Sequence, residues 1–265
     1  MKMISVFVLM GIFLLSGCGV PPRIPAGERI DSNTSDTDAD ARGRARIHTD
    51  LAVNYLEIRN LGVALEEAGI AQRSDPTYAP AYNVAGLIYI ELKDDRMAEE
   101  SFREALRINA RDSDANNNYG TFLCQRKREA EGVKHFLLAI SDPLYQYADR
   151  SFINAGVCAR RRGDIADAEN YFQSALKIQP NQIQALYQLA DMAYARARYT
   201  EARSFLARLI PVSAGSPEIL WLMLRTERRL GDGNSMDSLA HQLRANFPDS
   251  QEAALLAARQ KDCTT

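Results

Sequence analysis

Residues 148–180 read ADRSFINAGVCARRRGDIADAENYFQSALKIQP and contain the pattern that decides the fold. Apolar residues recur at helical spacing in 148–159 and again in 163–178, so two amphipathic helices are expected. The Arg-rich stretch between them predicts a short turn, and Pro180 predicts the end of the second helix. The segment therefore predicts a pair of helices joined by a tight turn.

Small residues mark the places where these two helices must approach each other. Gly156 lies on the first helix, and Ala168 and Ala175 lie on the second. Phe172 fills the space between the helices. The same pattern recurs along the chain at a spacing of 34 or 36 residues. Matching sets are Tyr82, Gly86, Tyr89, Ala98, Phe102 and Ala105; Tyr119, Gly120, Gly132, Phe136 and Ala139; and Leu186, Leu189, Ala190, Ala202, Leu206 and Leu209.

The repeated unit resembles the tetratricopeptide repeat (TPR), a helix-turn-helix of 34 residues with small residues at the crossing and Pro after the second helix. The first and last copies depart most, because Ala68 and Ala240 replace the aromatic residue. Terminal repeats are usually atypical. The resemblance implies an all-α, right-handed superhelical solenoid of six repeats with a C-terminal capping helix and tail at 251–265. The repeats are predicted at 45–78, 79–112, 113–146, 149–182, 183–216 and 217–250, with a two-residue insertion near Tyr147.

The first 44 residues predict a targeting signal, a lipid attachment site and a linker. Residues 1–17 have a short positive start and an apolar run too short to span a bilayer, which is typical of a signal peptide. Leu15-Ser16-Gly17-Cys18 resembles a bacterial lipobox, which implies a covalent lipid on Cys18; the alternative is a secretory peptide with a chance cysteine. Gly19 in place of Asp favours the outer membrane by the same resemblance, on its periplasmic face. Residues 18–44 are poor in apolar side chains and predict a flexible linker.

Composition and motifs exclude several function classes. Lys and Arg number 32 against 34 Asp and Glu, so the net charge of -2 argues against a globally basic nucleic-acid binder. Three scattered His residues leave little material for a metal site. Zinc-protease, nucleophile-elbow, phosphate-loop and C-x-x-C motifs are absent from the sequence. We therefore expect no catalysis, no metal, no cofactor beyond the lipid, and no small-molecule substrate.

The first helix of each repeat is expected to line the concave side of a TPR solenoid. Asn suits peptide-backbone recognition, and aromatic residues and Arg are common anchors at interfaces. For each single residue the sequence leaves partner binding and a scaffold role open. The residues predicted to face this groove are Asn83, Asn117, Thr121, Arg160, Tyr187, Tyr194, Trp221, Arg225 and Arg228.

Two further patterns leave alternatives open. Basic residues recur in the turns at 126–128, 160–162, 196–198 and 228–229. They form either a basic ridge that meets an acidic protein or anionic lipid, or solvated turns next to helix C-termini. Cys124 and Cys158 are separated by 34 residues on neighbouring first helices, and they are either bridged or two buried thiols.

The whole chain resembles the PilF/PilW family of type IV pilus biogenesis lipoproteins. The lipobox, the stretch ANNNYGTFLC at 115–124 and the stretch NAGVC at 154–158 carry this resemblance. It implies a monomeric pilotin that binds the pilus secretin subunit and promotes its outer-membrane localisation and multimerisation. Two alternatives are a scaffold for outer-membrane protein assembly and a regulator of a cell-wall enzyme.

Replacing Cys18 tests the predicted lipid attachment and membrane association. Cys18→Ser is expected to abolish incorporation of labelled palmitate and to release the protein from the membrane fraction, because stable anchoring needs several acyl chains. Metabolic labelling followed by fractionation measures both effects, and Cys263→Ser should leave them unchanged. A Cys18→Ser protein of unchanged size that stays in the membrane fraction would contradict the lipoprotein assignment.

Overall fold

The computed structural model describes residues 32–210 and 215–262. The signal peptide, Cys18 and residues 19–31 lie outside the described part. The described residues form thirteen helices and no strand. The helices are α1 Ser32–Glu57, α2 Leu61–Ser74, α3 Ala79–Glu91, α4 Asp95–Ile108, α5 Ser113–Gln125, α6 Glu129–Ala139, α7 Ala148–Arg162, α8 Ile165–Ile178, α9 Ile183–Ala195, α10 Tyr199–Leu209, α11 Pro217–Leu230, α12 Gly233–Asn246 and α13 Gln251–Asp262.

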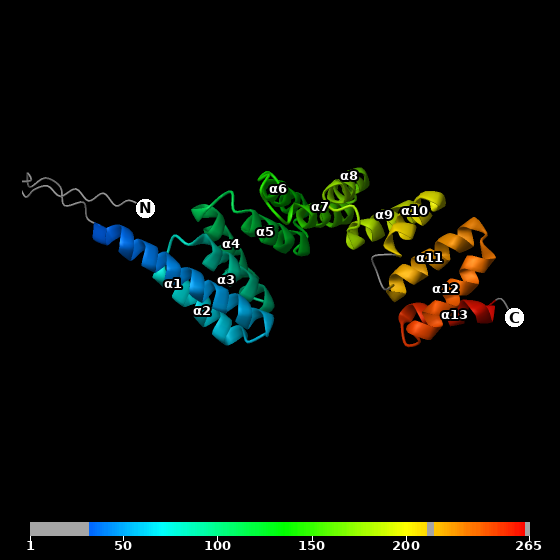
Figure 1. Cartoon of the computed structure of the whole chain (residues 1–265), viewed down its shortest axis with the longest axis horizontal. Coiled ribbons are helices and arrows are strands. Elements are labelled where there is room, and N and C mark those ends of the chain that lie inside the picture. Colours follow the sequence, from blue (N-terminus) through cyan, green and yellow to red (C-terminus); the bar gives the residue numbers. More distant parts are fainter. Residues whose placement is uncertain (1–31, 211–214, 263–265) are drawn as a thin grey trace, which may run out of the picture.

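Successive helices pair, and the six pairs stack into an arch (Figure 1). The odd-numbered helices from α1 to α11 are the first helices of the pairs. Most of them also touch the first helix of the next pair, whereas the second helices of neighbouring pairs make almost no contact with each other. The stack therefore curves with its first helices on the inner side. This is the superhelical TPR solenoid that the repeat pattern predicts.

A glycine–phenylalanine contact holds three of the pairs together. Each glycine lies on a first helix, and the phenylalanine comes sixteen residues later on the second helix. A Cβ at Gly156 would lie 2.7 Å from a ring carbon of Phe172, so only glycine lets the ring approach the helix backbone. All three rings are buried. The pairs are Gly86 with Phe102, Gly120 with Phe136, and Gly156 with Phe172.

The fifth and sixth repeats fill the same space with different side chains. At these two positions the fifth repeat has Ala190 and Leu206, which pack in one cluster. The sixth repeat exchanges the sizes, so that Leu224 lies on the first helix and Ala240 on the second. The sequence pattern identifies the last repeat as atypical, because Ala240 replaces the aromatic residue of the second helix. The structure shows that the volume has moved to the partner helix, which keeps the core filled.

Each turn between paired helices contains one residue in the left-handed conformation. Its φ lies between 58° and 93°, and the successive separations are 34, 34, 36, 34 and 34 residues. The backbone of every turn therefore repeats with the sequence, and the single longer interval contains the insertion near Tyr147. These residues are Arg59, Lys93, Lys127, Gly163, Ala197 and Gly231.

The first helix begins earlier than predicted. A flexible linker is expected as far as residue 44, but α1 begins at Ser32, so this expectation is wrong for the residues from Ser32 onward. Arg42 lies 5.4 Å from the ring centre of Tyr78 and 3.5 Å from the carboxylate of Asp75. Arg44 pairs with Asp40 one turn earlier. Contacts with Asp75 and Tyr78, which lie between α2 and α3, therefore stabilise a helix whose composition alone resembles a tether.

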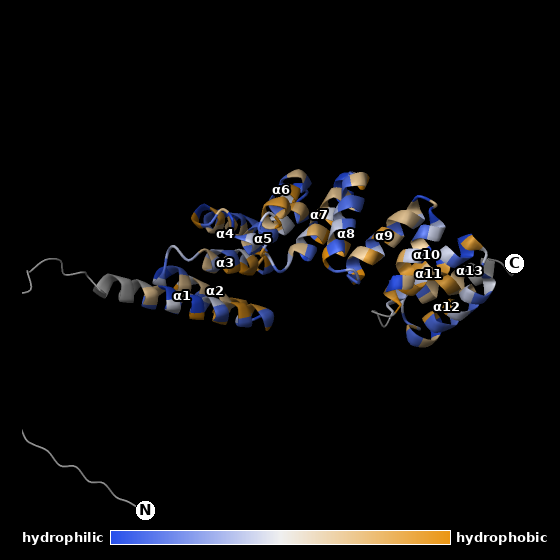
Figure 2. Ribbon diagram, turned by 45° about the horizontal axis from the view of Figure 1, so that its top comes forward, coloured by the Kyte–Doolittle hydropathy of each residue, from blue (hydrophilic) through white to orange (hydrophobic). Residues whose placement is uncertain are grey.

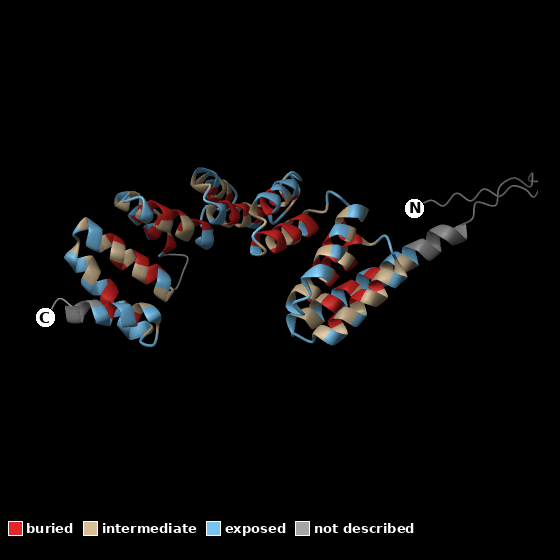
Figure 3. Cartoon of the chain, turned by 180° about the vertical axis from the view of Figure 1, so that it is seen from behind, coloured by how far each residue is buried: buried red, intermediate tan, exposed pale blue. Residues whose placement is uncertain are grey.

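The C-terminal end of the stack is covered by α13, which packs against α11 and α12 through Ala253 and Leu256. Figure 2 shows hydrophobic and hydrophilic positions alternating along the helices. Figure 3 shows buried positions running along the pairs from α1 to the last repeat. Within the described residues, none of the helices combines the length and apolar character that crossing a bilayer requires.

The close approach of two glycines in the third repeat gives a stability test. A Cβ at Gly132 would lie 2.8 Å from the carbonyl oxygen of Gly120 and 3.2 Å from the backbone nitrogen of Cys124. Since neither atom can turn away, Gly132→Ala is expected to cost about 1–3 kcal/mol. Chemical denaturation followed by circular dichroism measures this loss.

Gly43 provides the matched control, because a Cβ there meets no atom within 4 Å on α1. Gly43→Ala should raise stability by roughly 0.5–1 kcal/mol, since alanine favours a helix over glycine. Equal unfolding midpoints for the two variants would show that the helix approach does not require glycine.

Candidate functional site

A row of asparagine side chains crosses the inner side of the arch from α3 to α7. The side-chain amide of Asn118 donates to Asn83 Oδ1 at 3.1 Å. Asn117 Oδ1 accepts from Ser151 Oγ at 2.9 Å and from Asn154 Nδ2 at 3.1 Å. Because these groups already bond to one another, they hold neighbouring repeats in register. Asn83 is buried, so the predicted role of Asn83 as a groove contact is wrong, and it serves the scaffold.

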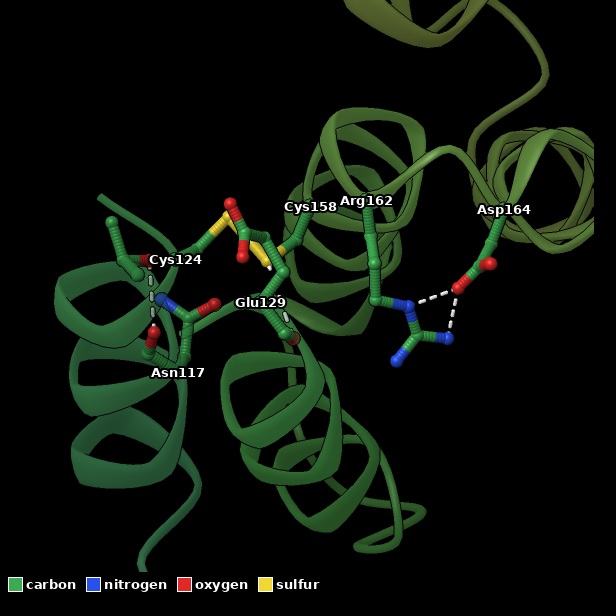
Figure 4. Close-up of a disulfide and its surroundings, with 7 residues drawn as sticks. Asn117, Cys124, Glu129, Cys158, Arg162 and Asp164 are labelled. Carbon is green, nitrogen blue, oxygen red and sulfur yellow. Dashed lines mark hydrogen bonds and ion pairs between the residues drawn. A yellow bond between two sulfur atoms is a disulfide. The ribbon is translucent and has the colours of Figure 1, made fainter. Parts of the chain in front are cut away.

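The predicted cysteine pair lies next to this row. Cys124 on α5 and Cys158 on α7 form a disulfide with 5.8 Å between their Cα atoms (Figure 4). The Cys158 sulfur also lies 3.6 Å from the carbonyl oxygen of Glu129. Thr121 donates to the carbonyl of Asn117 one turn earlier, so its hydroxyl is used within α5. The disulfide links the third and fourth repeats.

Further along the inner side, Arg160 on α7 bridges to α9. Its guanidinium donates to Gln188 Oε1 at 2.6 Å and to Asp191 Oδ2 at 2.5 Å. Tyr187 is half-buried beside Asp191, and burial together with the nearby carboxylate raises the pKa of its phenol. Tyr187 packs against the cluster of Leu186 and Leu206 and stays partly exposed, whereas the guanidinium of Arg160 is already paired.

The last predicted groove residues gather on α9 and α11. Arg225 lies over the ring of Tyr194 at 4.3 Å, which joins α9 to α11. Trp221 is half-buried one turn before Arg225 and packs against the cluster of Leu220 and Leu224. Arg228 is exposed at the end of α11. The structure thus brings these predicted residues together and separates them from the asparagine row.

The basic turns of the third and fifth repeats are neutralised mainly by carboxylates of the preceding repeat. Arg126 pairs with Asp95, and Arg128 pairs with Glu99 at 2.8 Å and Glu131 at 2.7 Å. Burial tends to raise the pKa of Glu99, but hydrogen bonds from Arg128 and Tyr119 outweigh it and lower that pKa. In the fifth repeat Arg196 and Arg198 both pair with Glu169. These turns therefore do not form a continuous basic ridge, because the arginines of the third and fifth repeats bind carboxylates and join neighbouring repeats, whereas Arg228 and Arg229 make no ion pair among the described residues.

The sequence did not predict a hollow on the inner side near the N-terminus. It has a volume of about 390 Å³ and lies among α1, α3 and α5. Leu56, Leu87 and Ile90 provide its apolar lining, and Arg59 pairs with Glu91 at its rim. Helical periodicity alone does not separate a core position from the wall of an open groove, so the sequence pattern gives no signal for this hollow.

The described residues show no group of three or more His, Cys, Asp or Glu side chains that is able to hold a metal ion. The inner side instead combines aromatic rings, guanidiniums and a hollow along one continuous face. That arrangement suits recognition of a protein segment.

Comparisons with known proteins identify the repeat and the family. Models of the tetratricopeptide repeat match residues 79–112 and 159–225. The crystal structure of PilW, a widely conserved type IV pilus biogenesis factor, is 32% identical and superposes with a TM-score of 0.72 over 80% of this chain and 98% of that one. The chain belongs to the PilF/PilW family of type IV pilus biogenesis TPR proteins.

The Pseudomonas aeruginosa relatives agree with this membership. The type IV pilus assembly protein PilF of that organism is 28% identical over 242 residues, which cover 91% of this chain and 94% of PilF. The solved structure of P. aeruginosa PilF superposes with a TM-score of 0.74, at 27% identity over 84% of this chain and 99% of that chain. The similarity therefore extends over nearly the whole length of these family members.

Removing the disulfide tests its contribution to the inner face. The bridge closes a loop of 34 residues, so Cys124→Ser with Cys158→Ser is expected to cost about 3–4 kcal/mol by the loop-closure model. Thermal unfolding with and without reductant measures the loss, and Cys263→Ser is the control. If the double variant unfolds at the midpoint of the parent chain, the bridge does not stabilise this junction.

Proposed function

We propose that this protein is a pilotin, an outer-membrane lipoprotein that binds the type IV pilus secretin subunit and promotes its localisation and multimerisation. Membership of the PilF/PilW family is the observation that supports this most. The lipobox at Cys18 supports the membrane anchor, although Cys18 lies outside the described residues.

The architecture fits a binding role without a chemical step. The inner side offers one extended surface that runs over five first helices, from α3 to α11. The side-chain links between these helices hold that surface in a defined shape before a partner arrives. A preorganised surface binds with a smaller entropic cost than a flexible one.

A lipid anchor converts this binding into assembly. Each tethered copy holds one secretin subunit near the outer-membrane surface, which raises the local concentration of subunits there. Ring formation then proceeds between subunits that share one plane. In this mechanism the protein contributes proximity and orientation, and the secretin contributes the contacts of the ring.

A deletion strain complemented with variants tests the proposal. Loss of pilus fibres and of secretin multimers in the deletion strain, together with capture of the secretin by the tagged repeats, is the expected result. Intact secretin multimers in that strain, or capture of no secretin, would overturn it. Intact pili with altered porins would instead indicate a role in outer-membrane protein assembly.

Tyr187 tests which side of the arch is used. Tyr187→Ala removes a half-buried aromatic edge from the inner side and is expected to weaken secretin binding at least tenfold, as for a typical interface anchor. Tyr147→Ala is the matched control, because it removes an equal ring from the exposed loop before α7. Equal affinities for the two variants would place the partner on another face.

A further inference from the structure

Three guanidiniums at the end of α11 have no carboxylate partner among the described residues. Arg225, Arg228 and Arg229 lie within two turns of one helix, and no ion pair in the described part of the chain includes them. This differs from the third and fifth repeats, where the turn arginines are paired. The positive charge of this end of the arch is therefore available to a partner.

The nearby carboxylates are engaged elsewhere. Asp191 on α9 accepts from Arg160, and Glu201 on α10 pairs with Arg198. Glu227, on α11 itself, pairs with Arg203 on the neighbouring α10. Each of these acidic groups is committed to an arginine outside the cluster, so the protein does not neutralise Arg225, Arg228 and Arg229 from within its described residues.

Two tyrosines orient this charge. Arg225 lies 4.3 Å from the ring centre of Tyr194, and Arg229 lies 5.8 Å from that of Tyr199. The two rings meet edge to face with centres 5.4 Å apart. Stacking fixes the plane of a guanidinium while leaving N–H groups at its edge for an acceptor. Burial tends to raise the pKa of Tyr194, but hydrogen bonds from Arg229 and Arg225 outweigh it and lower that pKa.

The spacing of the arginines matches an extended chain. Four residues along a helix rise about 6 Å, which separates the backbone positions of Arg225 and Arg229. In an extended segment, side chains on the same side recur about every 6.6 Å. Two carboxylates separated by one residue therefore fit the two stacked guanidiniums, and Arg228 adds a third, exposed charge beside them.

The position on the arch favours a peptide over a membrane. Tyr194 and Arg225 belong to α9 and α11, which are first helices and line the inner side (Figure 1). A flat bilayer does not reach a concave face, whereas an extended segment lies along it. Bidentate pairing of guanidinium with carboxylate also supplies direction, which a diffuse lipid surface does not require.

We propose that Arg225, Arg228 and Arg229, framed by Tyr194 and Tyr199, bind an acidic protein segment that carries two carboxylate side chains separated by one residue. We name these five residues the α11 basic–aromatic surface. The assignment of that segment to the secretin rests on the proposed function. The acidic chemistry follows from the surface itself.

Trp221 is the single tryptophan of the chain and lies one turn before Arg225, so its fluorescence reports on this surface. The probe is a serine-glycine dodecapeptide with one Glu-Ser-Glu triplet, titrated into the purified chain at low salt. Its Gln-Ser-Gln counterpart should bind about tenfold more weakly, because it retains hydrogen bonding but lacks charge. Raising the salt concentration should weaken only the Glu-Ser-Glu peptide.

Variants locate the interaction. The triple variant Arg225→Gln, Arg228→Gln and Arg229→Gln should lose the preference for the acidic peptide. The triple lysine variant should recover part of it, because charge returns without the guanidinium fork. Arg161→Gln is the matched control, since Arg161 is exposed and occupies the repeat position of Arg229 two repeats earlier. Circular dichroism confirms that each variant retains its helices.

Three outcomes would overturn the proposal. They are equal affinity for the two peptides, an equal loss of affinity in the Arg161→Gln control, and Arg-dependent binding to phosphatidylglycerol vesicles without binding to the acidic peptide. Secretin capture separates this inference from the proposed function. If the parent chain captures secretin and the triple glutamine variant captures it equally, the surface is wrong while the pilotin role stands. If the parent captures none, the pilotin role fails and the peptide titration still decides the surface.

Discussion

The approach of a second helix to the backbone of the first is the constraint on which the rest of this molecule depends. A phenylalanine ring reaches that backbone only where the first helix has no side chain, as Gly156 and Phe172 show. From the second repeat to the sixth, the two side chains sixteen residues apart keep a similar total volume, because the sixth repeat places Leu224 on the first helix and Ala240 on the second. The crossing thus stays filled while its residues change. The first repeat departs from this rule, since Ala52 and Ala68 are both small.

The sequence predicted this part of the fold well, because the contact is local. Helical periodicity, the small residues and the closing proline all repeat within one unit, so Gly156 and Phe172 were identified before the structure. Contacts between repeats were not predictable in this way. The pairing of Arg128 with Glu99 spans 29 residues and depends on the rise and twist of the stack. The contact of Arg42 on α1 with Tyr78 was not predictable for the same reason, since the fold brings the start of α3 back to α1.

The sequence predicted which types of residue line the inner side, but it did not predict what each of them does there. The sequence indicated that polar and aromatic residues face inward, yet it did not show which of them already have partners. Asn83 bonds to Asn118, and Arg160 bonds to Asp191, so both join first helices of neighbouring repeats. Arg225 lies over Tyr194 in the same position between α9 and α11 but has no carboxylate to neutralise it. Along the inner side, polar side chains that bond to one another in the N-terminal repeats therefore give way to arginines on α11 that no carboxylate among the described residues neutralises.

The disulfide lies where the spacing of the repeats changes. The turn-to-turn interval lengthens from 34 to 36 residues between Lys127 and Gly163, so the stack changes its register there. The bridge between Cys124 and Cys158 crosses the same junction on the inner side. A covalent link at the junction with the longer interval limits the relative movement of the third and fourth repeats, and so of the N-terminal repeats and the C-terminal repeats that contain the unneutralised arginines. Because α6 also packs closely on α7, this junction is held both by side-chain packing and by a covalent bond, and the inner faces of α5 and α7 keep a defined relation before a partner binds.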